Sequence, residues 1–250
     1  MNAWYNNTLD DNISDLAKTK ADVDWMYRNF LGTGTNLAIL YASDSVVKNA
    51  NMVKAIEYAK TKNIKFGRAY SSLGEVNTVL AHNAANPTNK FVQMVTEIEP
   101  YNTGDYTGFY NIITQAYPKI KAAGMTHTVY MGWPTNAAWL PIVQNCDEIN
   151  LHCYLKPTSM NESGIWGYVQ GRLGQIAAAC KQANKKIKLN IIYSCEPSFA
   201  GPWFSTHTWW NAHQIFMSAW DKHASADMKT YLNATNMVMF VSKYGKQIKP

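Results

Sequence analysis

The regular recurrence of short β-type runs along the chain is the feature that most constrains its fold. Between the runs lie stretches whose apolar residues recur at the i, i+3, i+4 and i+7 spacing of an amphipathic helix. Strands and helices that alternate at this pitch require a parallel sheet covered by helices. The predicted strands are Asn36–Ala42, Lys65–Ser71, Phe91–Glu99, His127–Trp133, Glu148–Leu155, Lys188–Glu196 and Met237–Lys243.

The chain length favours a closed barrel over an open sheet. Its 250 residues match the usual size of an α/β (β/α)8 barrel, and Ala3–Asn6 supplies an eighth strand beside the seven clear ones. The helical stretch before the last strand is expected over Trp209–Leu232, and no helix is expected after that strand, as in a truncated barrel. An open doubly wound sheet is the alternative, but no Gly-x-Gly-x-x-Gly turn supports it. Without a linker or internal repeat, residues 1–250 are predicted to form one domain.

Composition and charge exclude several classes of protein. Apolar residues make up 47% of the chain and charged residues 16%, and no apolar run approaches the roughly 20 residues of a membrane span. The net charge of +6 comes from scattered Lys and Arg, so we expect no nucleic-acid partner. The four Cys show no Cys-x-x-Cys spacing, so we expect neither a metal site nor a cofactor, and a disulfide stays open.

The expected cellular location rests on composition. The N-terminus shows no basic and apolar segments of a signal peptide. Heavy use of Asn, Thr, Tyr and Trp with few charges is typical of exported, sugar-handling proteins. We therefore expect a secreted or periplasmic protein that acts as a monomer.

Three predicted strands deliver polar groups to one end of the barrel. Side chains alternate faces along a strand, so Glu97 and Glu99 share a face at the end of the fourth strand, and Glu196 ends the seventh. On the sixth strand, Asn150, His152 and Tyr154 share a face. Barrel enzymes act at the C-terminal ends of their strands, so these groups are expected to converge at a working site.

Paired carboxyl groups across a pocket are what glycoside hydrolysis needs. One donates a proton to the leaving oxygen, and the other attacks the sugar or activates water. Glu99 is our expected acid/base and Glu196 the expected nucleophile. Glu97 lies two residues from Glu99, and two negative charges this close together raise the pKa of one of them. Because Glu99 is the expected acid, we expect its pKa to be the one that is raised.

Aromatic residues gather at the same end and favour a sugar ligand, because flat rings stack on the apolar face of a pyranose. The alternative is that these rings only close the top of the core. The residues that we expect to bind substrate are Tyr70, Asn102, Trp133, Asn150, His152, Tyr154, Tyr193 and Trp203.

Two segments resemble known glycoside hydrolases. Residues 91–102, FVQMVTEIEPYN, resemble the fourth strand of the chitinase-like family 18 hydrolases, and residues 147–154, DEINLHCY, are similar to that family's sixth strand. The resemblance implies that Glu99 is the proton donor, that Glu97 assists the substrate's acetamido group and that Tyr154 holds the substrate. The layout also resembles the retaining hydrolase clan with catalytic Glu on strands four and seven, and uncharacterised secreted bacterial barrels.

The sequence leaves the activity open between three functions. The first is a glycoside hydrolase that cleaves a poly- or oligosaccharide with paired Glu residues. The second is a barrel that binds glycan without cleaving it, since neither family motif is intact: Val92 and Val95 stand where family 18 has Asp. The third is another barrel enzyme, such as a lyase or a metal-dependent hydrolase.

Overall fold

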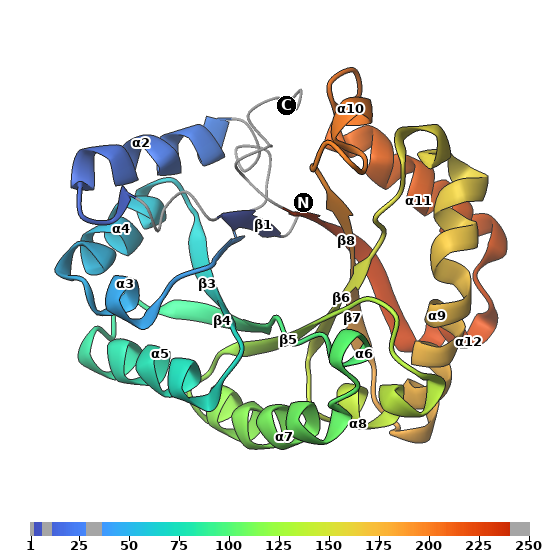
Figure 1. The fold of residues 1–250 in the computed structure, drawn as a ribbon, viewed down its shortest axis with the longest axis horizontal. Coiled ribbons are helices and arrows are strands. Elements are labelled where there is room, and N and C mark those ends of the chain that lie inside the picture. Colours follow the sequence, from blue (N-terminus) through green and yellow to red (C-terminus); the bar gives the residue numbers. More distant parts are fainter. Residues whose placement is uncertain (1–2, 7–11, 29–36, 241–250) are drawn as a thin grey trace.

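Eight parallel strands form the frame of the molecule. In the computed structural model, which describes residues 3–6, 12–28 and 37–240, they pair in chain order, and β8 pairs back with β1 to close a barrel (Figure 1). The (β/α)8 fold class is confirmed, with Ala3–Asn6 as its first strand. The strands are β1 (Ala3–Asn6), β2 (Leu37–Leu40), β3 (Lys65–Tyr70), β4 (Phe91–Thr96), β5 (Thr126–Met131), β6 (Glu148–His152), β7 (Ile187–Ser194) and β8 (Leu232–Phe240).

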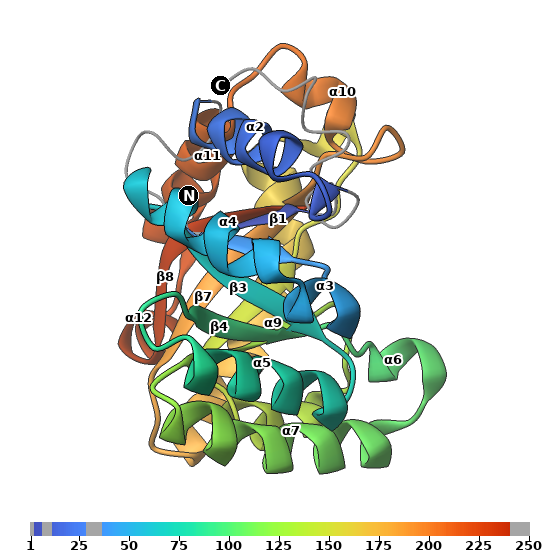
Figure 2. The same ribbon diagram turned by 90° about the vertical axis from the view of Figure 1, so that its left-hand side faces the viewer.

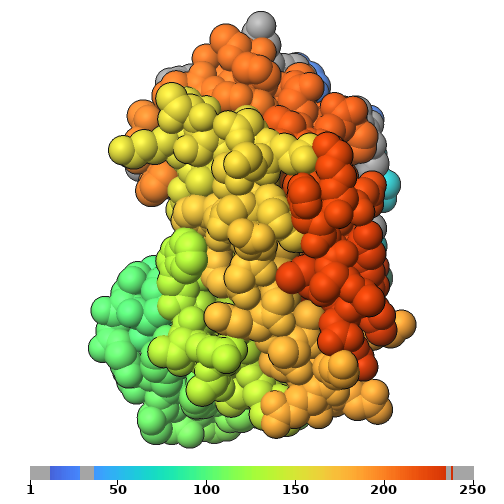
Figure 3. All heavy atoms as spheres, turned by 90° about the vertical axis from the view of Figure 1, so that its right-hand side faces the viewer, coloured from blue at the N-terminus to red at the C-terminus, as the bar shows by residue number. Residues whose placement is uncertain are grey.

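Helices surround the barrel and bury its outer face (Figure 1). On one side α9 packs against α8, α11 and α12, and Figure 3 shows α9, α11 and α12 side by side as one wall. The side view shows α6 and α10, which follow β4 and β7, beyond the same end of the barrel (Figure 2). The helices are α2 (Leu16–Met26), α3 (Asp44–Lys48), α4 (Ala50–Thr61), α5 (Leu73–Ala85), α6 (Pro100–Thr103), α7 (Tyr106–Ala122), α8 (Trp139–Gln144), α9 (Glu162–Gln182), α10 (Gly201–Phe204), α11 (Trp209–His223) and α12 (Ala226–Tyr231).

Several predicted strands run past the ends of the observed ones, and two of the wrong boundaries have clear local reasons. The fourth strand ends at Thr96, whose hydroxyl accepts a hydrogen bond from the Ile98 backbone N–H, so Glu97 and Glu99 follow the strand. The last predicted helix breaks at Ser225, which caps α12 by accepting from the Met228 N–H. Leu232, expected in that helix, instead begins β8, and residues 241–243 of the predicted strand lie outside the described residues.

The barrel interior is filled in layers of alternating polarity. Ile39, Ala69, Val95, Tyr130, Ile192 and Val238 form an apolar layer. Nearer the N-terminal ends of the strands lies a polar layer. There Gln93 donates to Thr128, Asn190 donates to Asn150 at 2.8 Å, and Lys188 pairs with Glu148 at 2.7 Å. Because these layers fill the lower barrel, any ligand site must lie above them, at the C-terminal mouth.

Candidate functional site

Glu99 stands at the barrel mouth, where β4 turns into α6. It precedes Pro100, the first residue of α6, and occupies the N-cap position without a side-chain cap hydrogen bond. Its carboxylate accepts hydrogen bonds from the Tyr101 hydroxyl and from the Asn102 amide, both at 2.6 Å. The side chain remains 32% exposed, so a ligand in the mouth can reach it.

His152 lies beside Glu99 at the end of β6. Its Nε2 is 3.7 Å from the nearer Glu99 carboxylate oxygen and has no hydrogen-bond partner. The ring stacks on Tyr154 at 4.5 Å between centroids and contacts Tyr130 at 4.2 Å. Burial lowers the pKa of His152 to about 3, and the nearby Arg172 charge acts in the same direction. The imidazole is therefore neutral at ordinary pH, and its approach to Glu99 is not an ion pair.

Glu97 has a different environment although it is two residues from Glu99. Burial raises the pKa of Glu97 to about 8; a hydrogen bond from Tyr41 opposes this shift, and the Glu99 charge adds to it. Its Oε1 is buried without a hydrogen-bond partner. The sequence places the raised pKa on Glu99; in the structure a raised pKa is found at Glu97, and its main cause is burial rather than the neighbouring charge.

Arg172 of α9 bonds to the backbone next to the mouth, and its role was not predicted from the sequence. Its guanidinium group donates to the backbone oxygens of Gly132, His152 and Tyr168 at 2.8, 3.0 and 2.8 Å. The Trp133 ring lies over the guanidinium carbon at 3.8 Å and is 51% exposed. The signal in the sequence is an Arg three residues after Val169, on the buried face of a helix.

Gly132 allows this close assembly. A Cβ atom there would lie 2.5 Å from the Tyr101 hydroxyl oxygen and 2.9 Å from Nδ1 of His152. Any larger residue would push these two side chains apart. Glycine at this position therefore lets β5, β6 and α6 meet at the mouth.

Glu196 also lies at the C-terminal end of the barrel, directly after β7. Its carboxylate accepts from the Ser194 hydroxyl at 2.9 Å. Within the described residues, no hydrogen bond or ion pair joins Glu196 to Glu97 or Glu99. The loop that follows Glu196 approaches the mouth through Phe199, whose ring centroid is 5.3 Å from that of Tyr154.

Three residues expected to bind substrate have their polar groups directed away from the mouth, although Tyr70 also borders the hollow described below. Tyr70 and Tyr193 fall on the opposite strand parity from the inward-facing residues, so their hydroxyls reach into the helix layer. That of Tyr70 is hydrogen-bonded to His127 at 2.6 Å, and that of Tyr193 donates to the Ala212 oxygen at 3.5 Å. Asn150 faces inward but belongs to the polar layer deep in the barrel.

The remaining expected residues are at or near the C-terminal end. Asn102 contacts Glu99, as described above, and Tyr154 stacks on His152. Trp203 lies on α10 and stacks on His207 with a centroid distance of 4.1 Å. Two further residues that sequence reasoning did not select, Tyr41 and Tyr130, face the same interior as Tyr154.

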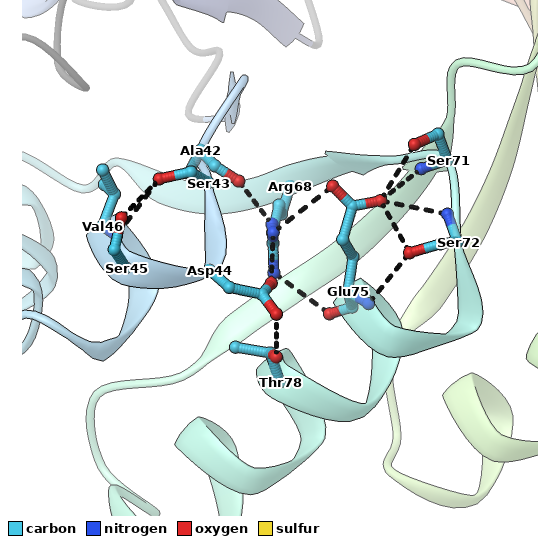
Figure 4. A network of polar contacts seen from close by, with 10 residues as sticks. All are labelled: Ala42, Ser43, Asp44, Ser45, Val46, Arg68, Ser71, Ser72, Glu75 and Thr78. Carbon is cyan, nitrogen blue, oxygen red and sulfur yellow. Dashed lines mark hydrogen bonds and ion pairs between the residues drawn. The ribbon is translucent and has the colours of Figure 1, made fainter.

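A hollow of about 230 Å³ opens beside Glu97, between the ends of β2, β3 and β4. It is lined by Tyr41, Ala42, Ser43, Ala69, Tyr70, Ser71, Glu75 and Glu97. A polar network supports its outer side (Figure 4): the buried Arg68 donates to the Ala42 oxygen at 2.9 Å and to the Asp44 carboxylate at 2.8 Å. Glu75 accepts from the backbone N–H groups of Ser71 and Ser72 at 2.7 and 3.0 Å, which fixes the start of α5.

Other kinds of site were sought in the described part of the chain. It contains no group of three or more His, Cys, Asp or Glu side chains that could hold a metal ion. None of the helices described has the length and hydropathy of a membrane span. All four Cys are buried free thiols.

Comparison with known proteins supports the architecture. No protein-family model and no curated protein sequence matches the chain. Among solved structures, an active-site mutant of a Rhizomucor miehei β-1,3-glucanosyltransferase in complex with laminaritriose superposes with a TM-score of 0.55 at 9% identity, over 96% of this chain and 86% of that one. This likeness shows a shared barrel fold.

Two more distant structures were also found. A Flavobacterium johnsoniae chitobiase gives a TM-score of 0.49 at 10% identity, over 97% of this chain and 44% of its own length. A D-psicose 3-epimerase, solved in the presence of D-fructose, gives 0.48 at 10% identity, over 96% of this chain and 84% of that one.

Proposed function

We propose that the C-terminal mouth binds an oligosaccharide and that Glu97 and Glu99 act together on a glycosidic bond. The observation that carries the proposal is the contrast between these two neighbours. Glu97 is partly buried, with one carboxyl oxygen fully enclosed, and its pKa is raised to about 8, so it keeps its proton at neutral pH. Glu99 is accessible, and both of its oxygens already accept hydrogen bonds. Glycoside hydrolysis uses one protonated acid and one carboxylate.

These environments favour roles that differ from the sequence expectation. Glu97 is the better proton donor, and Glu99 or Glu196 is the carboxylate that attacks the sugar or activates water. The family 18 resemblance gives the donor role to Glu99 instead. Tyr154, His152 and Trp133 supply rings on which a sugar can stack.

Turnover by Gln variants tests the proposal. Wild type is assayed on aryl glycosides and on laminari-, cello- and chito-oligosaccharides; laminari-oligosaccharides are included because the Rhizomucor miehei neighbour was solved with laminaritriose. Glu97→Gln and Glu99→Gln are each expected to lower kcat about 10²–10⁴-fold while binding persists, because Gln keeps the shape of Glu but cannot exchange a proton.

A control variant and a change of leaving group distinguish the roles of Glu97 and Glu99. Glu57→Gln, on the exposed face of α4, should leave kcat unchanged. With a highly activated aryl leaving group, which needs little protonation, the donor variant should recover rate and the other should not. If Glu99→Gln rather than Glu97→Gln recovers its rate, Glu99 is the proton donor, as the sequence predicts. A wild type that neither binds nor cleaves any glycan would overturn the proposal.

Binding without cleavage is the second candidate function. It is favoured by the exposed Trp133 ring held on Arg172, a flat apolar surface on which a sugar can stack. Binding across the glycan panel with no turnover would select it. In either case we propose a secreted or periplasmic location, where poly- and oligosaccharides are met.

A further inference from the structure

The hollow beside Glu97 has the size and lining of a sugar subsite. At about 230 Å³ it falls below the roughly 300–1,000 Å³ of pockets that enclose drug-sized ligands, so it suits a single small unit of a longer chain. Glu97 lines it, and one oxygen of its carboxyl group, Oε1, is buried without a hydrogen-bond partner. A buried polar atom without a partner costs free energy, which a ligand group can recover.

Among the residues that the structure describes, the lining of the hollow carries no positive charge. Its polar side chains are those of Tyr41, Ser43, Ser71, Glu75 and Glu97, whereas Tyr70 also borders the hollow but has its hydroxyl bonded to His127. Arg68, on the outer side of the hollow, is fully buried, and its nitrogens bond to Ala42, Asp44 and Glu75. A ligand carboxylate or sulfate would therefore meet acceptors and the Glu75 charge with no cation to pair with it.

We propose that this hollow is a subsite for one neutral sugar unit, in which Glu97 donates a hydrogen bond as an uncharged carboxylic acid. The proposal rests on the proposed function and adds its substrate class, a glycan without carboxylate or sulfate groups. Sugar hydroxyls both donate and accept, so they match a lining that offers the acid proton of Glu97 together with the hydroxyls of Ser71 and Ser43.

The subsite should weaken when Glu97 loses its proton. The groups that face Glu97 are Tyr41 after β2, Glu99 after β4, Tyr101 on α6 and Tyr154 after β6, with Glu75 of α5 across the hollow. Burial raises the pKa of both Tyr101 and Tyr154 above the ordinary tyrosine value, so these two stay protonated at pH 9. A change in binding between pH 6.5 and pH 9 then reports Glu97.

Calorimetric titration tests this directly. Laminarihexaose and chitohexaose serve as neutral probes and a galacturonic acid hexamer as the charged probe, at pH 6.5 and pH 9. We expect the neutral probe that binds best to lose about tenfold or more in affinity at pH 9, because a donor is replaced by a buried negative charge. Glu97→Gln, which keeps an N–H donor at every pH, should bind alike at both. The charged hexamer should bind at least tenfold more weakly than the neutral probe.

A variant that fills the hollow tests whether the sugar binds there. Ser71→Phe, which places a ring in the hollow, should lower affinity for the neutral probe at least tenfold, whereas Thr61→Phe, exposed at the far end of α4, should not. Circular dichroism verifies that both variants fold. Binding that is independent of pH in wild type, undiminished in Ser71→Phe, or equal for the charged hexamer would overturn the subsite while leaving the proposed function intact. A wild type that binds none of the probes would overturn both.

Discussion

A single buried guanidinium group, that of Arg172, joins two strand ends and one helix at the mouth. Its donors satisfy three backbone oxygens, and its face carries the Trp133 ring. Replacing Arg172 with Met would remove the hydrogen bonds that its guanidinium group gives to these oxygens. We expect the free energy of unfolding to fall by about 2–4 kcal/mol, measured from the urea midpoint.

The matched control for Arg172→Met is Arg28→Met, because Arg28 is exposed. It should change the free energy of unfolding by less than about 0.5 kcal/mol. Arg172→Lys keeps the charge, but its single ammonium cannot span three carbonyls as the planar guanidinium does, so it should recover only part of the loss. If Arg172→Met and wild type are equally stable, the Arg172 hydrogen bonds make no net contribution to the free energy of unfolding.

At the scale of elements, the starts of two helices are fixed by polar contacts that also support the proposed subsite. Ser72 caps α5 in a capping box with Glu75, and Arg68 ties this turn to α3 through Asp44. Ser72→Ala should lower the free energy of unfolding by about 1 kcal/mol, because the Glu75 N–H loses its acceptor. Ser163→Ala, on the exposed side of α9, should be neutral or slightly stabilising, since alanine has the higher helix propensity. A loss as large in Ser163→Ala would contradict this account.

At the scale of the whole molecule, hydrophobic runs and strand parity predict the barrel better than they predict the candidate functional site. Every predicted strand is present because each run contains the buried residues of a β-strand. Parity also accounts for the inward position of His152 and for the outward position of Tyr193. The aromatic character of Tyr193 taken alone predicts a place at the mouth, which its parity opposes. Arg172 could not be found this way, because its role depends on a helix and two strands that are distant in sequence.

Three buried groups should set the dependence of global stability on pH. Burial lowers the pKa of His127 to about 4 and of His152 to about 3, against an ordinary value of 6.5. Below pH 6.5 the unfolded chain therefore binds protons that the folded chain does not, and stability is lost as pH falls. Glu97 acts in the opposite direction. Its pKa is raised from 4.5 to about 8, so between these values the folded chain keeps a proton that the unfolded chain has released, and stability is lost as pH rises.

We therefore expect the free energy of unfolding to be greatest near pH 6.5. Between pH 4.5 and 6.5 His127 and His152 oppose Glu97, and the partly buried His213, whose pKa burial also lowers, acts with them, so stability rises with pH. From pH 6.5 to 8 the effect of Glu97 dominates, and stability declines by up to about 1.4 kcal/mol per pH unit. Urea unfolding across this range measures the profile. Glu97→Gln should abolish the decline above pH 6.5 and leave the acid limb, whereas Glu57→Gln should alter neither. If wild type and Glu97→Gln show the same slope between pH 6.5 and 8, Glu97 is not held protonated in the folded protein, and both its donor role and the neutral-sugar subsite lose their physical basis.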